Sequence, residues 1–207
     1  MLAFTDKEKK LFKKLNTPAK VQDFLNKLKF NLEKDGVDTI KSPLRVLRVR
    51  NAHCIEGAIF GAYVLSLHGF TPYLICLKAA EGVGDDHHVI VPFKVNGFWG
   101  ALSKTNHIVL RYREPVYKNI RELCMSYFHE YFLENGKKTL RKYSALFNLN
   151  TLKTDWVTAD KDLWYIDKAL DKVRYYDIVP KSYLNKLRLA DKIERQAIKI
   201  VEYKNVV

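Results

Sequence analysis

One stretch of the chain decides its fold: Ala52-His53-Cys54-Ile55-Glu56-Gly57-Ala58-Ile59-Phe60-Gly61-Ala62-Tyr63-Val64-Leu65. The pattern from Cys54 to Leu67 is helical and unusually apolar, which predicts a buried helix. Its glycine and alanine residues allow the helix to approach a sheet closely, and His68-Gly69 ends it. We therefore expect a central helix whose first turn carries a cysteine.

The residues that follow predict an antiparallel sheet. Strand-like runs occupy 72–78, 87–95, 98–103 and 107–112. Asn96-Gly97 is the strongest short signal for a two-residue hairpin, and with that turn Val95 pairs with Phe98 and Ile90 with Ser103. The expected fold class is α+β, with the cysteine-bearing helix packed on this sheet.

Further elements surround this centre. We expect a basic amphipathic helix over 5–15, and a second helix that begins at Thr17-Pro18 and is closed by Asp35-Gly36. The range 43–51 is expected to be an arginine-rich connection, and helices are expected over 116–135 and near 187–203. We expect a core over 1–135 and a basic, aromatic C-terminal extension over 136–207 that packs on it, together forming one structural domain.

Composition narrows the class of protein. The chain has 207 residues, 47% hydrophobic content and a net charge of +13. It has no apolar run long enough for a bilayer and no secretory leader at Met1, so we expect a cytoplasmic protein. The basic balance makes nucleic acid a possible partner, but lysine and arginine are scattered and no nucleic-acid motif accompanies them, so a solvated surface is favoured. No metal-ligand cluster, phosphate loop or dinucleotide fingerprint occurs, so we expect no metal and no cofactor.

Of the three cysteines, only Cys54 has an unusual setting. Cys76 lies in an apolar strand-like run and Cys124 in a helical pattern, where both are expected to be packing residues. The first turn of a helix stabilises a thiolate, and its free N–H groups can bind an oxyanion. Asn51 is placed to cap this helix. Position alone leaves Cys54 equally consistent with a reactive thiol and with a buried structural one.

The hairpin register brings polar groups to one histidine. His88 lies opposite Thr105 with Ser103 as its diagonal neighbour, whereas His87 points to the other face. His88 is therefore the histidine with hydroxyl groups within reach. Taken alone, the run 85–88 is better explained as a polar loop that enters a strand.

Four motifs in order extend this pattern. They are Ala52-His53-Cys54-Ile55-Glu56-Gly57-Ala58, His68-Gly69-Phe70-Thr71-Pro72, His88-Val89-Ile90-Val91 and Trp99-Gly100-Ala101-Leu102-Ser103. The set resembles the cysteine motif, the helix-to-strand turn, the histidine strand and the third motif of the transglutaminase-like superfamily, which has a papain-like fold. The resemblance covers roughly residues 17–112. It implies that Cys54 is a nucleophile, that His88 is a general base and acid, and that Ser103 orients His88.

Position 103 departs from the family, which normally has aspartate there. A serine hydroxyl can accept the Nδ1–H of His88 but adds no negative charge; neutral orienting groups do serve in Cys-His-Asn sites. Thr105 is an alternative orienting residue, and Asp85 or Asp86 in the preceding loop are alternative sources of charge. We expect a less stabilised thiolate–imidazolium pair than in the family.

Other residues near the motifs have a structural and a functional interpretation. For Glu56 we favour a structural role as a first-turn acid. His53 and His107 are reserve bases, each better explained as a surface or packing residue. Trp99 is better explained as a hairpin core residue, although it and Asn51 are also candidate substrate contacts.

The leading hypothesis is cysteine-dependent acyl transfer or amide hydrolysis on a peptide or protein substrate, through a thioester on Cys54. The first alternative keeps the fold without the chemistry, as a catalytically inactive binding module. The second is a basic nucleic-acid-binding domain. No membrane partner is expected.

Overall fold

The Asn96-Gly97 turn builds the hairpin at the centre of the sheet. The computed structural model describes residues 3–33 and 37–204. Asn96 and Gly97 both have positive φ, 50° and 86°, as a type I′ turn requires. They join β4 (His88–Val95) to β5 (Phe98–Ser103) in the predicted register, with Val95 opposite Phe98 and Ile90 opposite Ser103.

The hairpin belongs to a seven-stranded sheet with the order β6-β5-β4-β3-β7-β9, in which β8 also pairs with β3. Each of these pairs is antiparallel. The other strands of this sheet are β3 (Tyr73–Ala79), β6 (Arg113–Tyr117), β7 (Leu140–Ser144), β8 (Phe147–Asn148) and β9 (Tyr175–Asp177). A separate parallel pair joins β1 (Lys29–Phe30) to β2 (Asn51–Ala52). Because β7 lies beside β3, residues after 135 complete the sheet itself.

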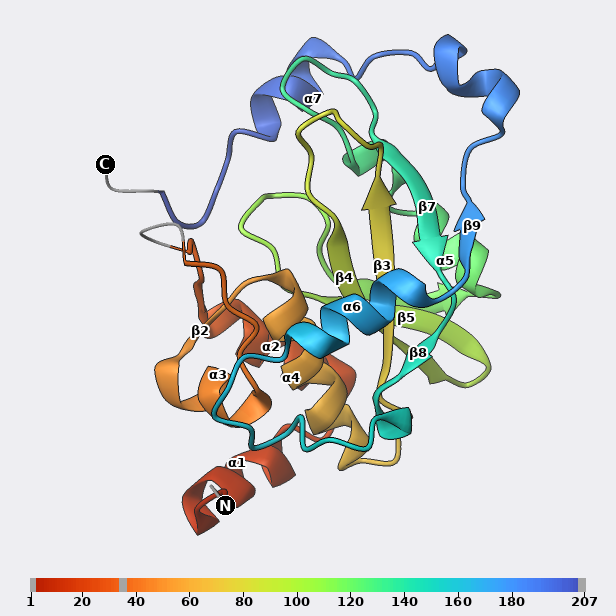
Figure 1. Ribbon diagram of the computed structural model, residues 1–207. Helices are drawn as coiled ribbons and strands as arrows, with labels where there is room; N and C mark the ends of the chain where they lie inside the picture. Colours follow the sequence, from red (N-terminus) through yellow and green to blue (C-terminus); the bar gives the residue numbers. More distant parts are fainter. Residues whose placement is uncertain (1–2, 34–36, 205–207) are drawn as a thin grey trace.

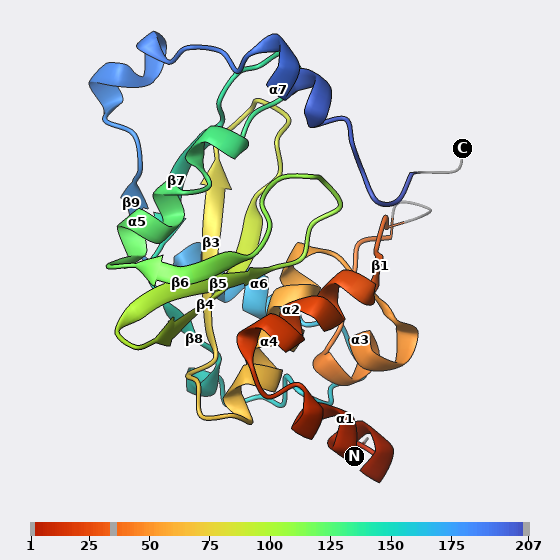
Figure 2. The same ribbon diagram turned by 180° about the vertical axis from the view of Figure 1, so that it is seen from behind.

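Helices cover both faces of the sheet. The α-helices are α1 (Asp6–Lys14), α2 (Pro18–Lys27), α3 (Pro43–Val49), α4 (Cys54–Ser66), α5 (Ile120–Met125), α6 (Trp164–Lys172) and α7 (Lys192–Ala197). Short 3-10 helices are η2 (Phe128–Glu130), η3 (Leu149–Thr151) and η4 (Lys181–Lys186). In Figure 1, α4 and α6 lie in front of the sheet, and in Figure 2, seen from behind, α5 lies in front of β3 and β7. No helix within 3–33 and 37–204 is long and apolar enough to cross a membrane.

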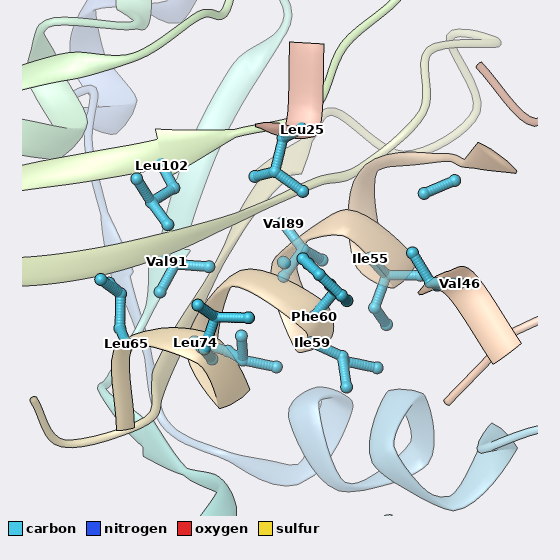
Figure 3. Close-up of a cluster of buried hydrophobic side chains, with 14 of the residues drawn as sticks. Leu25, Val46, Ile55, Ile59, Phe60, Leu65, Leu74, Val89, Val91 and Leu102 are labelled. Carbon is cyan, nitrogen blue, oxygen red and sulfur yellow. The ribbon is translucent and has the colours of Figure 1, made fainter. Parts of the chain in front are cut away.

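The larger core lies between α4 and the sheet. Figure 3 draws Ile59, Phe60 and Leu65 of α4 in one cluster with Leu74 of β3 and Val91 of β4. Side chains of β3 alternate between the two faces, with Leu74 in this core and Ile75 in the smaller core on the other side. The expected class, α+β with a central cysteine-bearing helix on an antiparallel sheet, is confirmed.

Two glycines set the distance between α4 and β5. A Cβ atom at Gly57 would lie 2.5 Å from Cβ of Lys104, and one at Gly61 would lie 3.0 Å from a methyl group of Leu102. The predicted close approach of α4 to the sheet is therefore confirmed. It brings the first turn of α4 next to the end of β5.

Two predictions made from the sequence are wrong, one of a connection and one of a strand. The expected connection over 43–51 contains α3, where Ser42 caps the helix and Pro43 occupies its first position. The strand expected over 107–112 is a loop, in which an isolated bridge joins His107 to Val201, and the next strand is β6.

The other helices expected from the sequence are shorter than predicted. The one over 116–135 is reduced to α5 and η2, because its first residues belong to β6 and the Arg113 guanidinium binds both the hydroxyl and the carbonyl of Ser126 at the end of α5. The one near 187–203 is reduced to α7. The helix that starts at Pro18 ends at Lys27, well before Asp35-Gly36, a pair that lies outside the described residues.

Candidate active site

Cys54 is the first residue of α4. The residue that caps this helix is His53, so the prediction that Asn51 caps it is wrong. Asn51 instead pairs with Lys29 in the small parallel sheet. The N–H groups of a first helical turn have no partner within the helix, so the Cys54 sulfur lies beside donors that favour negative charge.

Three cavities meet at Cys54. Their volumes are about 410, 510 and 280 Å³, and Cys54 and His87 line all three. The 410 Å³ cavity continues past His88 to Tyr131, whose hydroxyl donates to the Asp86 carbonyl and so anchors the loop before β4. The Cys54 side chain is half-buried, so a ligand in this cleft can reach it.

His88 is held by Ser103. Its Nε2 lies 2.7 Å from the Ser103 hydroxyl, which itself donates to the Leu110 carbonyl. Because that hydroxyl has a single hydrogen, His88 must donate its Nε2–H, which leaves Nδ1 as the nitrogen available to Cys54. The expected bond between His88 and Ser103 is present, but through Nε2 and not through Nδ1 as predicted. The Thr105 hydroxyl accepts from the N–H of His107.

Ser103 is fixed in turn by a residue that the sequence did not single out. The Gln22 side chain accepts the N–H of Ser103 at 3.0 Å and donates to its carbonyl at 2.8 Å. Gln22 is buried on α2, with Val21 as its apolar neighbour. An amide on the buried side of an amphipathic helix is the one sequence signal that points to it.

His53 is the second imidazole at the sulfur. Its Nε2 lies 2.7 Å from the Thr39 carbonyl, 3.3 Å from Glu33 and 3.6 Å from Glu56. Burial alone would lower the pKa of His53, but the contact with Cys54 and the charge of Glu56 raise it to about 9. From its sequence context alone, His53 is only a reserve base.

The two rings together change the acidity of the thiol. Burial would raise the pKa of Cys54, but hydrogen bonds with His53 and His88 and the charges of both rings lower it to about 5. In contrast, burial raises the pKa of Cys76 to about 11 and raises that of Cys124 as well. Both of those thiols are buried, and the packing role predicted for them fits their position.

Glu56 has the structural contacts of a buried ion pair. It is fully buried and lies 2.8 Å from the ammonium group of Lys41. It also accepts the hydroxyl of Thr39 and the backbone N–H of His53. The structural role favoured for Glu56 agrees with these contacts, and the same carboxylate faces the His53 ring.

Three other candidate residues do not have the positions that a role in the reaction would need. Trp99 pairs with Lys94 near the turn of the hairpin, about 20 Å along β4 from His88 at the usual rise per residue. This position agrees with the favoured interpretation as a hairpin residue and not with the alternative role as a substrate contact. Asn51 is absent from the described walls of the cleft. Asp85 accepts from the Thr139 hydroxyl and does not orient His88.

Carboxylates outnumber lysines on the described walls of the cleft. The acidic residues are Glu33, Asp85, Asp86, Glu130, Glu134, Asp167 and Asp171, and the lysines are Lys78 and Lys104. This charge is opposite to the +13 of the whole chain. Among the described residues, no group of three or more His, Cys, Asp and Glu side chains is arranged to hold a metal ion.

The comparisons with known proteins give a distant structural similarity and no match by sequence. No family model and no curated protein matches the sequence. Among solved structures, Legionella pneumophila LapG aligns with a TM-score of 0.45 and 16% identity, over 82% of this chain and 90% of that one. Its calcium-bound form aligns with a TM-score of 0.43 and 14% identity, over 81% and 93%. Its EGTA-treated form aligns with a TM-score of 0.44 and 16% identity, over 82% and 90%. The function must therefore be inferred from the side chains themselves.

Proposed function

We propose that this protein is a transglutaminase-like cysteine enzyme that transfers the acyl group of an amide through a thioester on Cys54. The observation that carries the proposal is the setting of one sulfur atom. It lies at the start of a helix, beside two imidazole rings, with a pKa lowered to about 5, where three cavities meet. Thiolates in such settings are nucleophiles at neutral pH.

The reaction divides into two steps. The Cys54 thiolate attacks the amide carbonyl, and the C–N bond breaks as His88 gives the proton it took from the thiol to the leaving amine. The N–H groups of the first turn of α4 are placed to bind the oxyanion. His88, now neutral, takes a proton from water or from an amine, which attacks the thioester and releases the thiolate. Water gives hydrolysis, and an amine gives transamidation.

The cleft favours a peptide or protein substrate over nucleic acid. Phosphate groups bind where lysine and arginine collect, whereas this cleft is lined mainly by carboxylates. The basic surface elsewhere is compatible with the solvated charge expected from the sequence.

The first test is the pH dependence of Cys54 alkylation by iodoacetamide. Only the thiolate reacts, so the rate is expected to be half-maximal near pH 5 and constant at neutral pH, whereas an ordinary thiol is half-maximal at about pH 8.5. Mass spectrometry of the labelled peptide assigns the reaction to Cys54. Cys54→Ala is the control and removes the label, because Cys76 and Cys124 are buried.

A half-maximal rate near pH 8.5 would contradict the proposal. The protein would then be better described as a non-catalytic module of the same fold. The observation in favour of that second function is the serine at position 103, where an acid is expected.

The second test concerns Ser103. Ser103→Ala removes the acceptor of the His88 Nε2–H, and the loss of one such bond, about 1 kcal/mol, should lower kcat about fivefold. Ser103→Asp should not raise kcat, because the new carboxylate would face the Leu110 carbonyl oxygen that the hydroxyl now binds. Steady-state kinetics measures both. A gain of activity in Ser103→Asp would mean that the neutral hydroxyl is not the intended partner of His88.

A further inference from the structure

We propose that His53 is a permanently charged second partner of the Cys54 thiolate, and that it supplies the stabilisation which a serine at position 103 cannot give through His88. This inference rests on the proposed function, because it assigns a role within the same site. The reserve role considered for His53 from the sequence was that of an alternative base; the role proposed here is different.

The contacts of one ring nitrogen favour the charged form of His53. Nε2 faces the carbonyl oxygen of Thr39 at 2.7 Å, and since a carbonyl only accepts, Nε2 must carry hydrogen. The carboxylates of Glu33 and Glu56 lie 3.3 and 3.6 Å from the same nitrogen. With Nε2 engaged on this side, Nδ1 is the nitrogen left for the adjacent Cys54. Two anions on one side and a thiol on the other favour a ring protonated on both nitrogens.

The other charged groups around His53 fit this assignment. Lys41 is paired with Glu56 at 2.8 Å, which leaves Glu33 as the carboxylate near His53 that the lysine does not neutralise. From α6, Asp167 shares a cavity with His53 and adds negative charge. From the residues before β4, Asp85, Asp86 and His87 line a second cavity with His53, so that two further acids and one further imidazole face the same space. The Lys78 and Asp171 pair of the same cavity offset each other at 3.4 Å.

The remaining charged partner of the sulfur is His88, on β4. Its partner Ser103 is neutral, so the hydrogen bond that orients the His88 ring adds no charge to it. A thiolate that depended on His88 alone would lack the support that an acid at position 103 would give. The carboxylates behind His53 provide equivalent support from the other side of the sulfur.

The two histidines therefore have separate tasks. His53 keeps its proton through both steps and favours the negative sulfur electrostatically. His88 takes the thiol proton, passes it to the leaving amine and then activates the acceptor. No additional proton or co-reactant is needed, since the proton that leaves the thiol is the one that the amine receives.

The test compares the pH at which the Cys54 thiolate forms in the wild type, His53→Gln and His88→Gln. Thiolate formation is measured by its absorbance at the far-ultraviolet edge and by the rate of Cys54 alkylation. Loss of an adjacent opposite charge moves a pKa by about 1 to 3. We expect the midpoint of His53→Gln to rise by about 2 pH units, and its alkylation rate at pH 6 to fall about tenfold. Glutamine keeps a side-chain hydrogen-bond donor and cannot be charged.

Turnover of a peptide amide separates the two tasks. The activity of His53→Gln should return as pH rises through the new midpoint, since His88 is intact. The activity of His88→Gln should stay low at every pH. His68→Gln, whose ring binds the Phe12 carbonyl just beyond the C-terminal end of α4, is the matched control and should keep the wild-type midpoint.

Each outcome separates this inference from the proposed function. A low wild-type midpoint that is unchanged in His53→Gln overturns the role of His53 and leaves acyl transfer standing. A wild-type midpoint near that of a free thiol overturns the proposed function. If His53→Gln does not fold, Glu33→Gln tests the same charge, and it should raise the midpoint by a smaller amount in the same direction; an unchanged midpoint would again overturn the inference.

Discussion

Replacing His88 by alanine is expected to lower the rate of acyl transfer from an amide about 10⁴-fold or more, the loss typical of removing a catalytic base that acts as a unit with its nucleophile. The amine of an amide leaves only with a proton, and Nδ1 of His88 is the group placed to deliver it. We do not expect His53 to take over this task, since the carboxylates of Glu33 and Glu56 hold its ring in the charged form, which cannot accept the proton of the thiol. The measurement is single-turnover acylation with an N-acyl p-nitroanilide.

An activated ester makes the same experiment selective for proton transfer. The p-nitrophenolate anion leaves without a proton, so acylation by p-nitrophenyl acetate should fall much less in His88→Ala than acylation by the anilide. His129→Ala is the matched control, because that ring is exposed and packs against Phe128. Equal losses with the ester and the anilide would show that His88 supports the thiolate but does not transfer the proton.

The parts of the site that could be predicted are those set by local signals. An Asn-Gly turn fixes its own hairpin, and the hairpin fixes which residues oppose each other, so His88 and Ser103 were placed correctly from sequence alone. The apolar helix that starts at Cys54 was likewise predictable from the spacing of its apolar residues.

The parts that were missed depend on contacts between distant segments. The setting of His53 is formed by Thr39 and Glu33, neither of which belongs to a described helix or strand. Gln22 meets Ser103 across a gap of 81 residues. No local pattern encodes such a meeting, because it follows from how α2 packs against β5. The same holds for β7, which enters the sheet beside β3.

One wrong prediction, the connection expected over 43–51, has a local cause. Ser42-Pro43 is the same cap-and-proline signal as Thr17-Pro18, and both begin helices. Arg45 and Arg48 of α3, with Arg50 directly after it, made the segment resemble an exposed connection. They lie on its outer side, since Arg45 pairs with Asp162 and Arg48 with Glu8, while Leu44 and Leu47 are buried.

Replacing Glu56 by alanine is expected to lower the free energy of unfolding by about 3 to 5 kcal/mol, the usual effect of leaving one member of a buried ion pair alone. Lys41 has 6% of its side chain exposed and Glu56 none, so the remaining ammonium group would have no carboxylate and little water. Urea unfolding at pH 7 measures the change. The exposed pair of Asp6 and Lys9 gives the matched control, and Asp6→Ala should cost less than about 1 kcal/mol.

Two further measurements separate the effect of the charges of this ion pair on stability from the effect of its packing. The double variant Lys41→Met with Glu56→Leu should be more stable than Glu56→Ala, because it buries no unpaired charge.

Burial would raise the pKa of Glu56, but His53 and Lys41 hold that pKa below its ordinary value. The contribution of Glu56 to stability is therefore present above the unfolded pKa and is lost as pH falls through the folded pKa. The stability difference between wild type and Glu56→Ala should therefore shrink in acid, and a difference that stays constant from pH 7 to pH 3 would show that packing, and not charge, accounts for it. The same substitution removes one of the anions behind His53, so the midpoint of Cys54 thiolate formation should rise in any Glu56 variant that still folds. The buried pair would then support both the helix that carries the nucleophile and the charge that activates it.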